Sequence, residues 1–215
     1  MTLAIFGDSY ADTGIDPRRS WPCLLSGMVN NYSLSGSSLY YSYTQFLEHH
    51  HRYDKIVFLI TAWGRYHTQW GPISGLRGVE DQIEHSRGDR RRVFESLRDH
   101  IIYSQNDQEL RCYHQLMIKD IQTLRPDSLL IPCFDTQVSL FESRLDLYSV
   151  SLIDQQLWGI DMDRVKDLRC CHINDENNRI LAQGIDQWAQ SGRFTLSVKD
   201  FTTSSQSPDY YFVNL

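Results

Sequence analysis

The sequence predicts an α/β domain in which a parallel β-sheet carries helices on both faces. Short apolar runs typical of buried strands occur at residues 3–6, 55–61 and 128–133. Longer segments with helical spacing of apolar residues lie between them and after the last one. This alternation of strands and helices is typical of parallel sheets, in which each connecting helix packs back onto the sheet.

In the first third of the chain, the pattern predicts three strands at residues 3–6, 31–34 and 55–61. Between them it predicts two helices at residues 21–28 and 37–51. Pro22 suits the first turn of the first helix, because the N–H that proline lacks has no helical partner there. The last of these strands is the clearest, since it is continuous, apolar and rich in β-branched residues, as strands buried on both faces are.

The rest of the chain is less regular. Residues 62–90 are rich in Gly, Trp, His and Arg and are expected to form a long irregular excursion, of a kind that is often functional. Beyond it we expect a helical segment at residues 91–124 with a break near Asn106, and a strand at 128–133. A mixed segment at 134–166 and a helix at 174–190 follow. The domain is therefore predicted to span residues 1–192, and residues 193–215 form an aromatic tail or an extra strand.

Composition excludes several classes of function. The chain has 215 residues and a net charge of -6, whereas a nucleic-acid-binding protein needs a basic footprint. Its five cysteines are odd in number and form no C-x-x-C pair, so neither a disulfide framework nor a zinc site is expected. No P-loop and no dinucleotide-binding glycine pattern is present. We therefore expect no metal and no cofactor.

The N-terminus has no basic segment followed by an apolar stretch, so no signal peptide is expected. No segment is apolar over the length that a transmembrane helix needs. The sequence thus predicts synthesis in the cytoplasm without membrane insertion. Later association with a virion or a cell surface stays open, and the tail at residues 193–215 is a candidate to bind a protein partner.

Three residues predict hydrolytic chemistry. Ser9 follows the first strand directly, so its hydroxyl and nearby N–H groups project from the carboxyl end of the sheet. Gly36 follows the predicted second strand, and a glycine permits close backbone approach to a substrate. His172 precedes the last helix, where a histidine could take the proton of Ser9 and return it to a leaving group.

These residues resemble three motif blocks of the SGNH hydrolase superfamily, also called the GDSL family. Gly7-Asp8-Ser9 is similar to the first block, Gly36 to the second, and His172 to the last. The resemblance implies a flavodoxin-like three-layer α/β/α sandwich and metal-free ester hydrolysis, often of acetyl esters on carbohydrates. It assigns Ser9 as the nucleophile, His172 as the base and Gly36 as a donor to the oxyanion.

The chain departs from the family pattern in two places. Where the third block usually supplies an asparagine to the oxyanion, the segment from Thr61 to His67 has none, and Thr61 or Arg65 is the candidate replacement. Arg169 stands where the family commonly has the acid that orients the histidine. Asp167 is the candidate for that role and Asp163 a weaker one. A Ser9–His172 dyad is the alternative.

The leading prediction is therefore a serine esterase for a small ester or an acetylated glycan, the glycan resting on the family resemblance alone. Trp63, Tyr66 and Trp70 are candidates to stack on sugar rings, and packing of their loop onto the domain is the alternative. The rival prediction is an SGNH-fold protein with weak or lost catalysis that serves as a binding or structural part of a larger assembly, such as a viral particle.

Overall fold

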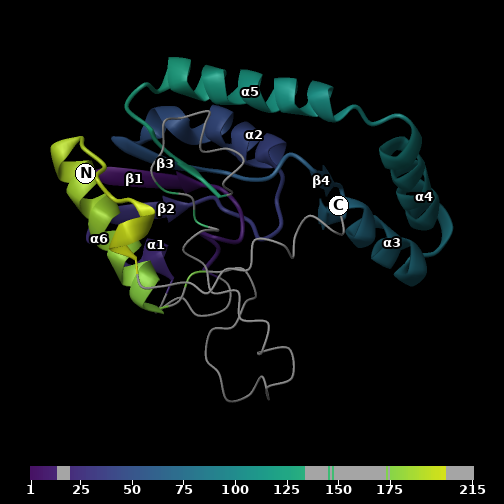
Figure 1. Ribbon diagram of the computed structural model, residues 1–215, viewed down its shortest axis with the longest axis horizontal. Helices are drawn as coiled ribbons and strands as arrows, with labels where there is room; N and C mark the ends of the chain where they lie inside the picture. Colours follow the sequence, from purple (N-terminus) through teal and green to yellow (C-terminus); the bar gives the residue numbers. More distant parts are fainter. Residues whose placement is uncertain (14–19, 134–144, 146, 148–172, 174, 202–215) are drawn as a thin grey trace.

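The structure is a computed structural model that describes residues 1–13, 20–133, 145, 147, 173 and 175–201. Its central sheet consists of β1 (Thr2–Phe6), β2 (Met28–Asn31), β3 (Lys55–Ile60) and β6 (Leu129–Pro132). All neighbouring strands pair in parallel, in the order β2-β1-β3-β6 (Figure 1). This order is that of flavodoxin-like sheets.

In the described part of the chain, the helices that cover the sheet are α1 (Trp21–Leu24), α2 (Leu39–His49), α5 (Asp107–Leu124) and α6 (Asp175–Ser191). Side chains of β1 alternate between its faces. Leu3 and Ile5 join a buried cluster with residues of α1 and α6. Ala4 and Phe6 join a second cluster with residues of α2 and α5, on the opposite face (Figure 1). The predicted α/β fold with three layers is therefore confirmed.

The prediction of an irregular excursion over residues 62–90 is wrong. The structure has a hairpin and two helices there: β4 (Arg65–Thr68), β5 (Gly71–Ser74), α3 (Gly75–His85) and α4 (Gly88–Tyr103). The hairpin loop is Gln69-Trp70, without the Gly or Asn that marks common two-residue turns. A third buried cluster holds this unit together through Ile73, Val79, Ile83 and Phe94.

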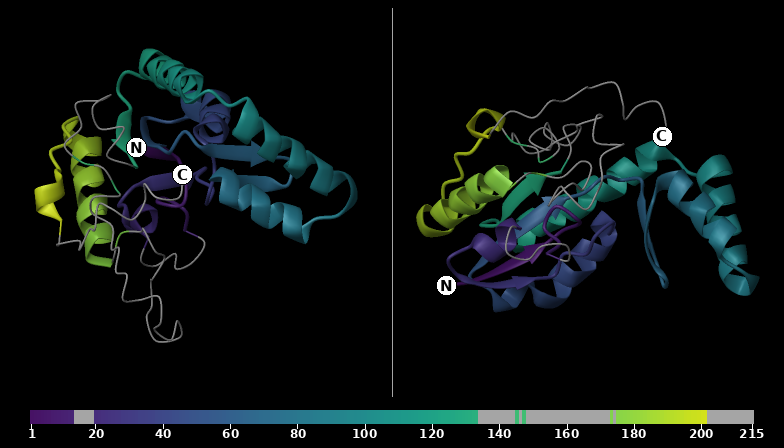
Figure 2. Two further views of the ribbon diagram at one scale, coloured as in Figure 1. Left: turned by 45° about the vertical axis from the view of Figure 1, so that its right-hand side comes forward. Right: turned by 90° about the horizontal axis from the view of Figure 1, so that it is seen from below.

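We call residues 65–103 the insertion. It lies beside the sheet near one end of α5, with its own small core (Figures 1 and 2). The break predicted near Asn106 is confirmed, because Asn106 caps α5 by accepting hydrogen bonds from the N–H groups of Gln108 and Glu109. None of the helices in the described part of the chain combines the length and apolar character needed to cross a membrane.

The predicted boundaries of α1 and β2 are also wrong. The helix expected over residues 21–28 ends at Leu24, and the strand expected over 31–34 runs from Met28 to Asn31. β2 is a largely exposed edge strand, so it lacks the apolar run that reveals a buried strand. Thr2 pairs with Met28, and this long-range register decides where the strand begins.

The chain after α6 packs against the domain. Gly192 ends the helix with a φ of 73°, a conformation that favours glycine. Phe194 and Leu196 pack on the cluster beneath α6, and Phe201 is buried in it. The structure thus places residues 193–201 on the domain, with no strand in that segment. Residues 202–215 lie outside the described part, so the alternative of an extra strand stays a prediction.

Gly7 follows β1 and lies tightly against the side chain of Leu59 in β3. A Cβ atom on Gly7 would stand 2.7 Å from the Cβ of Leu59, well inside ordinary carbon contact. We expect Gly7→Ala to lower the free energy of unfolding by about 1–3 kcal/mol, measured by urea denaturation. Gly64→Ala is the matched control, because a Cβ there meets no atom within 4 Å. Equal stability of the two variants would contradict this account of β1 packing.

Candidate active site

Ser9 lies in a tight turn directly after β1. The N–H of Ala11 donates to the carbonyl of Asp8 at 3.1 Å, and the N–H of Tyr10 donates to the Asp8 carboxylate, also at 3.1 Å. The backbone on both sides of Ser9 is therefore fixed. Strand order reverses between β1 and β3, and ligands of open α/β sheets bind at the carboxyl ends beside such a reversal. The turn thus stands at the position where this sheet type places its sites.

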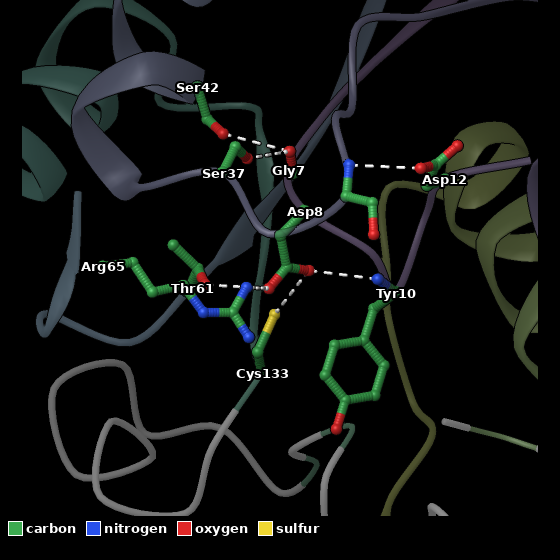
Figure 3. Close-up of polar contacts among 10 residues, drawn as sticks. Gly7, Asp8, Tyr10, Asp12, Ser37, Ser42, Thr61, Arg65 and Cys133 are labelled. Atoms are coloured by element: carbon green, nitrogen blue, oxygen red, sulfur yellow. Dashed lines mark hydrogen bonds and ion pairs between the residues drawn. The ribbon is translucent and has the colours of Figure 1, made fainter. Parts of the chain in front are cut away.

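The loop that contains Gly36 is fastened to the Ser9 turn. The carbonyl of Gly7 accepts hydrogen bonds from the hydroxyls of Ser37 and Ser42 at 3.0 and 3.1 Å (Figure 3). It also accepts one from the N–H of Leu34 at 3.2 Å. Gly36 itself has a φ of 74°, where side chains other than glycine are strained. The first and second motif segments are thereby brought together.

Two further hydrogen bonds join the same loops. The N–H of Ser35 donates to the carboxylate of Asp12 at 3.1 Å, and the side-chain amide of Asn31 donates to the carbonyl of Ala11 at 2.6 Å. Ser35, which precedes Gly36, is thus held by Asp12, which lies three positions after Ser9. Neither Asp12 nor Asn31 was predicted as a site residue, because only their partners across the loop reveal their role.

The carboxylate of Asp8 is the centre of a buried polar cluster. Asp8 is fully buried, and its Oδ2 accepts hydrogen bonds from Thr61 Oγ1 at 2.8 Å and Arg65 Nη1 at 2.6 Å (Figure 3). Its Oδ1 accepts from the Tyr10 N–H and from the thiol of Cys133 at 3.7 Å. Buried carboxylates require such paired charge and hydrogen bonds.

Thr61 and Arg65 therefore have a partner that the sequence did not predict. Both donate hydrogen bonds to the carboxylate of Asp8, the residue before Ser9. Their role as oxyanion donors stays a prediction. Sequence reasoning missed Asp8 and Cys133, although an aspartate directly after a buried strand is a group that needs a cation nearby.

Trp21 connects the Ser9 turn to the start of α6. Its indole N–H donates to the carbonyl of Tyr10 at 2.8 Å, and its backbone N–H donates to Asn178 Oδ1 at 2.9 Å. The amide nitrogen of Asn178 donates to the carbonyl of Ile173 at 3.0 Å. The residue after Ser9 and the residue after His172 are thus joined by a short chain of buried hydrogen bonds.

Removal of the Asn178 side chain is expected to leave two buried backbone groups unpaired, the N–H of Trp21 and the carbonyl of Ile173. We expect Asn178→Ala to reduce the free energy of unfolding by about 2–3 kcal/mol in chemical denaturation. Gln183→Ala is the control, because this exposed residue lies on the same helix. A loss no larger than that of the control would show that these bonds are dispensable.

Each of the three aromatic residues predicted to contact sugars has a neighbouring side chain in the structure. The guanidinium of Arg111 lies 4.4 Å from the ring centroid of Trp63. Tyr66 packs on the third cluster and its hydroxyl donates to Gln105. Burial, and then the charge of Asp107, raise the pKa of Tyr66, so the hydroxyl keeps its proton at neutral pH.

The ring of Trp70 also contacts another aromatic side chain, since its centroid lies 5.5 Å from that of Phe94. Trp63 contacts α5, whereas Tyr66 and Trp70 contact other residues of the insertion or next to it. Their contact with a substrate stays a prediction.

The remaining predicted site residues, His172, Asp167 and Asp163, lie outside the described residues. Ile173, which follows His172, is buried in the same cluster as Tyr10. Among the described residues, no group of three or more His, Cys, Asp or Glu side chains is arranged to hold a metal ion.

Comparisons with known proteins give a resemblance in structure only. No protein-family model matches the chain, and no curated protein matches it. A lipolytic protein of the G-D-S-L family from Desulfitobacterium hafniense DCB-2 shares 13% identity with a TM-score of 0.41, covering 86% of this chain and 98% of that one. An acetyl xylan esterase shares 14% identity with a TM-score of 0.35, covering 89% and 100%.

The function of this chain is therefore inferred from its own residues.

Proposed function

We propose that this protein is a serine hydrolase of carboxylic esters, with Ser9 as the nucleophile and His172 as the general base. The observation that carries the proposal is the joining of the Ser9 turn to the Gly36 loop through the carbonyl of Gly7. A serine at the end of the first strand then stands beside a glycine loop whose N–H groups can serve an oxyanion.

The sequence neighbours of Ser9 and His172 support the choice of His172 as the base. Tyr10 follows Ser9, Ile173 follows His172, and both belong to one buried cluster. Trp21 and Asn178 join them by hydrogen bonds. We therefore propose that the imidazole of His172 supplies the base that a serine nucleophile requires.

The proposed reaction has two halves. Ser9 Oγ attacks the acyl carbon while His172 takes its proton, and the N–H groups of Ser9 and Gly36 stabilise the negative oxygen of the tetrahedral intermediate. The intermediate expels the alcohol, which receives the proton from His172. Water then attacks the acyl-enzyme in the same way, which releases the acid and restores Ser9. We propose Asp167 as the residue that orients His172.

The proposed substrate is an acetyl ester of a carbohydrate. This class follows from the resemblance of the sequence motifs to the SGNH hydrolases. Trp63 is the aromatic residue that we propose for contact with the sugar, because it stands two residues after Thr61 at the carboxyl end of β3. Tyr66 is a weaker candidate, since its ring and hydroxyl hold the insertion.

The test is release of p-nitrophenol from p-nitrophenyl acetate by the wild type and by Ser9→Ala. We expect the variant to lose hydrolysis by at least about a thousandfold. Ser104→Ala, at an exposed serine after α4, is the control and should match the wild type. Equal rates in wild type and Ser9→Ala would overturn the proposal, and would favour a binding or structural role for the fold.

A further inference from the structure

We infer that Arg65 is a positioning residue that holds the Ser9 turn through its ion pair with Asp8. This role rests on the proposed function of Ser9, and it gives the departure from the family's third block a physical meaning. The guanidinium and the carboxylate meet at 2.6 Å, with side chains that are 16% and 0% exposed.

The Asp8 carboxylate acts on the backbone around Ser9. Its Oδ1 accepts from the N–H of Tyr10, so the side chain of the residue before Ser9 binds the backbone of the residue after it. Such turns are stabilised by an aspartate only while its carboxylate stays in place. The orientation of the Ser9 hydroxyl therefore depends on how firmly Asp8 is held.

What holds Asp8 comes from distant parts of the chain. Thr61 follows β3, Cys133 follows β6, and Arg65 begins β4. Of these three groups, only Arg65 carries a positive charge. A buried carboxylate that loses its cation is strongly destabilised, whereas loss of a neutral donor costs less. Arg65 is thus the main determinant of the position of Asp8.

The same contact joins the insertion to the site. Arg65 is the first residue of the hairpin, and the hairpin belongs to the third cluster rather than to the core of the sheet. The ion pair therefore crosses from the insertion to the turn after β1, over 57 positions of sequence. Loosening of this contact is expected to reach Ser9 without disturbing the strands of the sheet.

The experiment measures amide hydrogen exchange and ester hydrolysis for Arg65→Met, Arg65→Lys and a control, Arg91→Met. Arg91 also makes an ion pair in the insertion, with Glu95 at 2.8 Å. This pair is exposed to solvent, so its loss should have little effect on stability. Exchange of the β3 amides serves as the internal measure that the sheet remains folded.

We expect faster exchange at Tyr10 and Ala11 in Arg65→Met, with unchanged exchange in β3. The kcat for p-nitrophenyl acetate should fall about a hundredfold with KM nearly constant, as for a misplaced catalytic group. Arg65→Lys should restore most of both properties, because it returns the charge. Arg91→Met should behave as the wild type.

Two results would overturn the inference. Exchange at Tyr10 and Ala11 that is unchanged in Arg65→Met would show that the ion pair does not hold the turn. Loss of kcat without faster exchange would place Arg65 in the reaction itself. Failure of the proposed function looks different: Ser9→Ala would equal the wild type in hydrolysis, while faster exchange in Arg65→Met would still support the role of the ion pair in the turn.

Discussion

His172→Ala is expected to reduce the hydrolysis of p-nitrophenyl acetate by at least about a thousandfold. Without an adjacent base, the hydroxyl of Ser9 keeps its proton and attacks an ester very slowly. The measurement is kcat/KM by steady-state release of p-nitrophenol. His100→Ala is the control, because His100 is exposed near the end of α4 and should have no effect.

The double variant sharpens this prediction. Residues that act as one unit lose their shared contribution once, so Ser9→Ala combined with His172→Ala should be no slower than either single variant. Rate losses that multiply would contradict a shared catalytic step. A fully active His172→Ala would assign the base to another residue.

His114 is expected to make the protein sensitive to mild acid. It lies on α5, is 8% exposed, and its Nδ1 has no hydrogen-bond partner among the described residues. Burial lowers the pKa of His114 from 6.5 to about 4. The unfolded chain therefore binds a proton at this residue below pH 6.5, while the folded chain does not until about pH 4.

Stability should consequently fall as the pH drops from 6.5 to about 4, with a total loss of about 3 kcal/mol from this residue. We expect His114→Leu to flatten that dependence, measured by urea denaturation at pH 7 and pH 4.5. Burial also lowers the pKa values of His50 and His67, so a smaller slope should remain. A variant as sensitive to acid as the wild type would contradict the assignment to His114.

The sequence predicted best those elements whose burial shows directly in the local spacing of apolar residues. β1 and β3 are apolar on both faces because helices cover both sides, and such runs are visible without any partner. The same holds for α6, whose Leu181, Ile185 and Trp188 face the core at helical spacing. The parallel pairing of the strands was predicted from their alternation with helices.

The features that sequence missed depend on distant partners. β2 begins at Met28 because it pairs with Thr2, and its exposed residues carry no apolar signal. The insertion is held by sparse apolar residues that meet only after the hairpin forms. The ion pair of Asp8 and Arg65 joins two positions whose proximity no local pattern reveals.

The candidate site also combines residues that the sequence predicted with contacts that it did not. Ser9 and Gly36 were found from motif and position, and the structure brings their loops together through Gly7. The supporting bonds of Trp21 and Asn178 were not predicted, because hydrogen bonds between segments 157 residues apart leave no trace in composition or periodicity.

Covalent labelling of Ser9 tests the central claim most directly. The wild type is incubated with diisopropyl fluorophosphate, digested, and analysed by mass spectrometry for the peptide that contains Ser9. We predict one diisopropylphosphoryl group per chain on Ser9, with fluoride released, and much slower labelling in His172→Ala. Ester hydrolysis that persists with Ser9 unmodified, or a label on another residue, would contradict the assignment of Ser9 as the nucleophile.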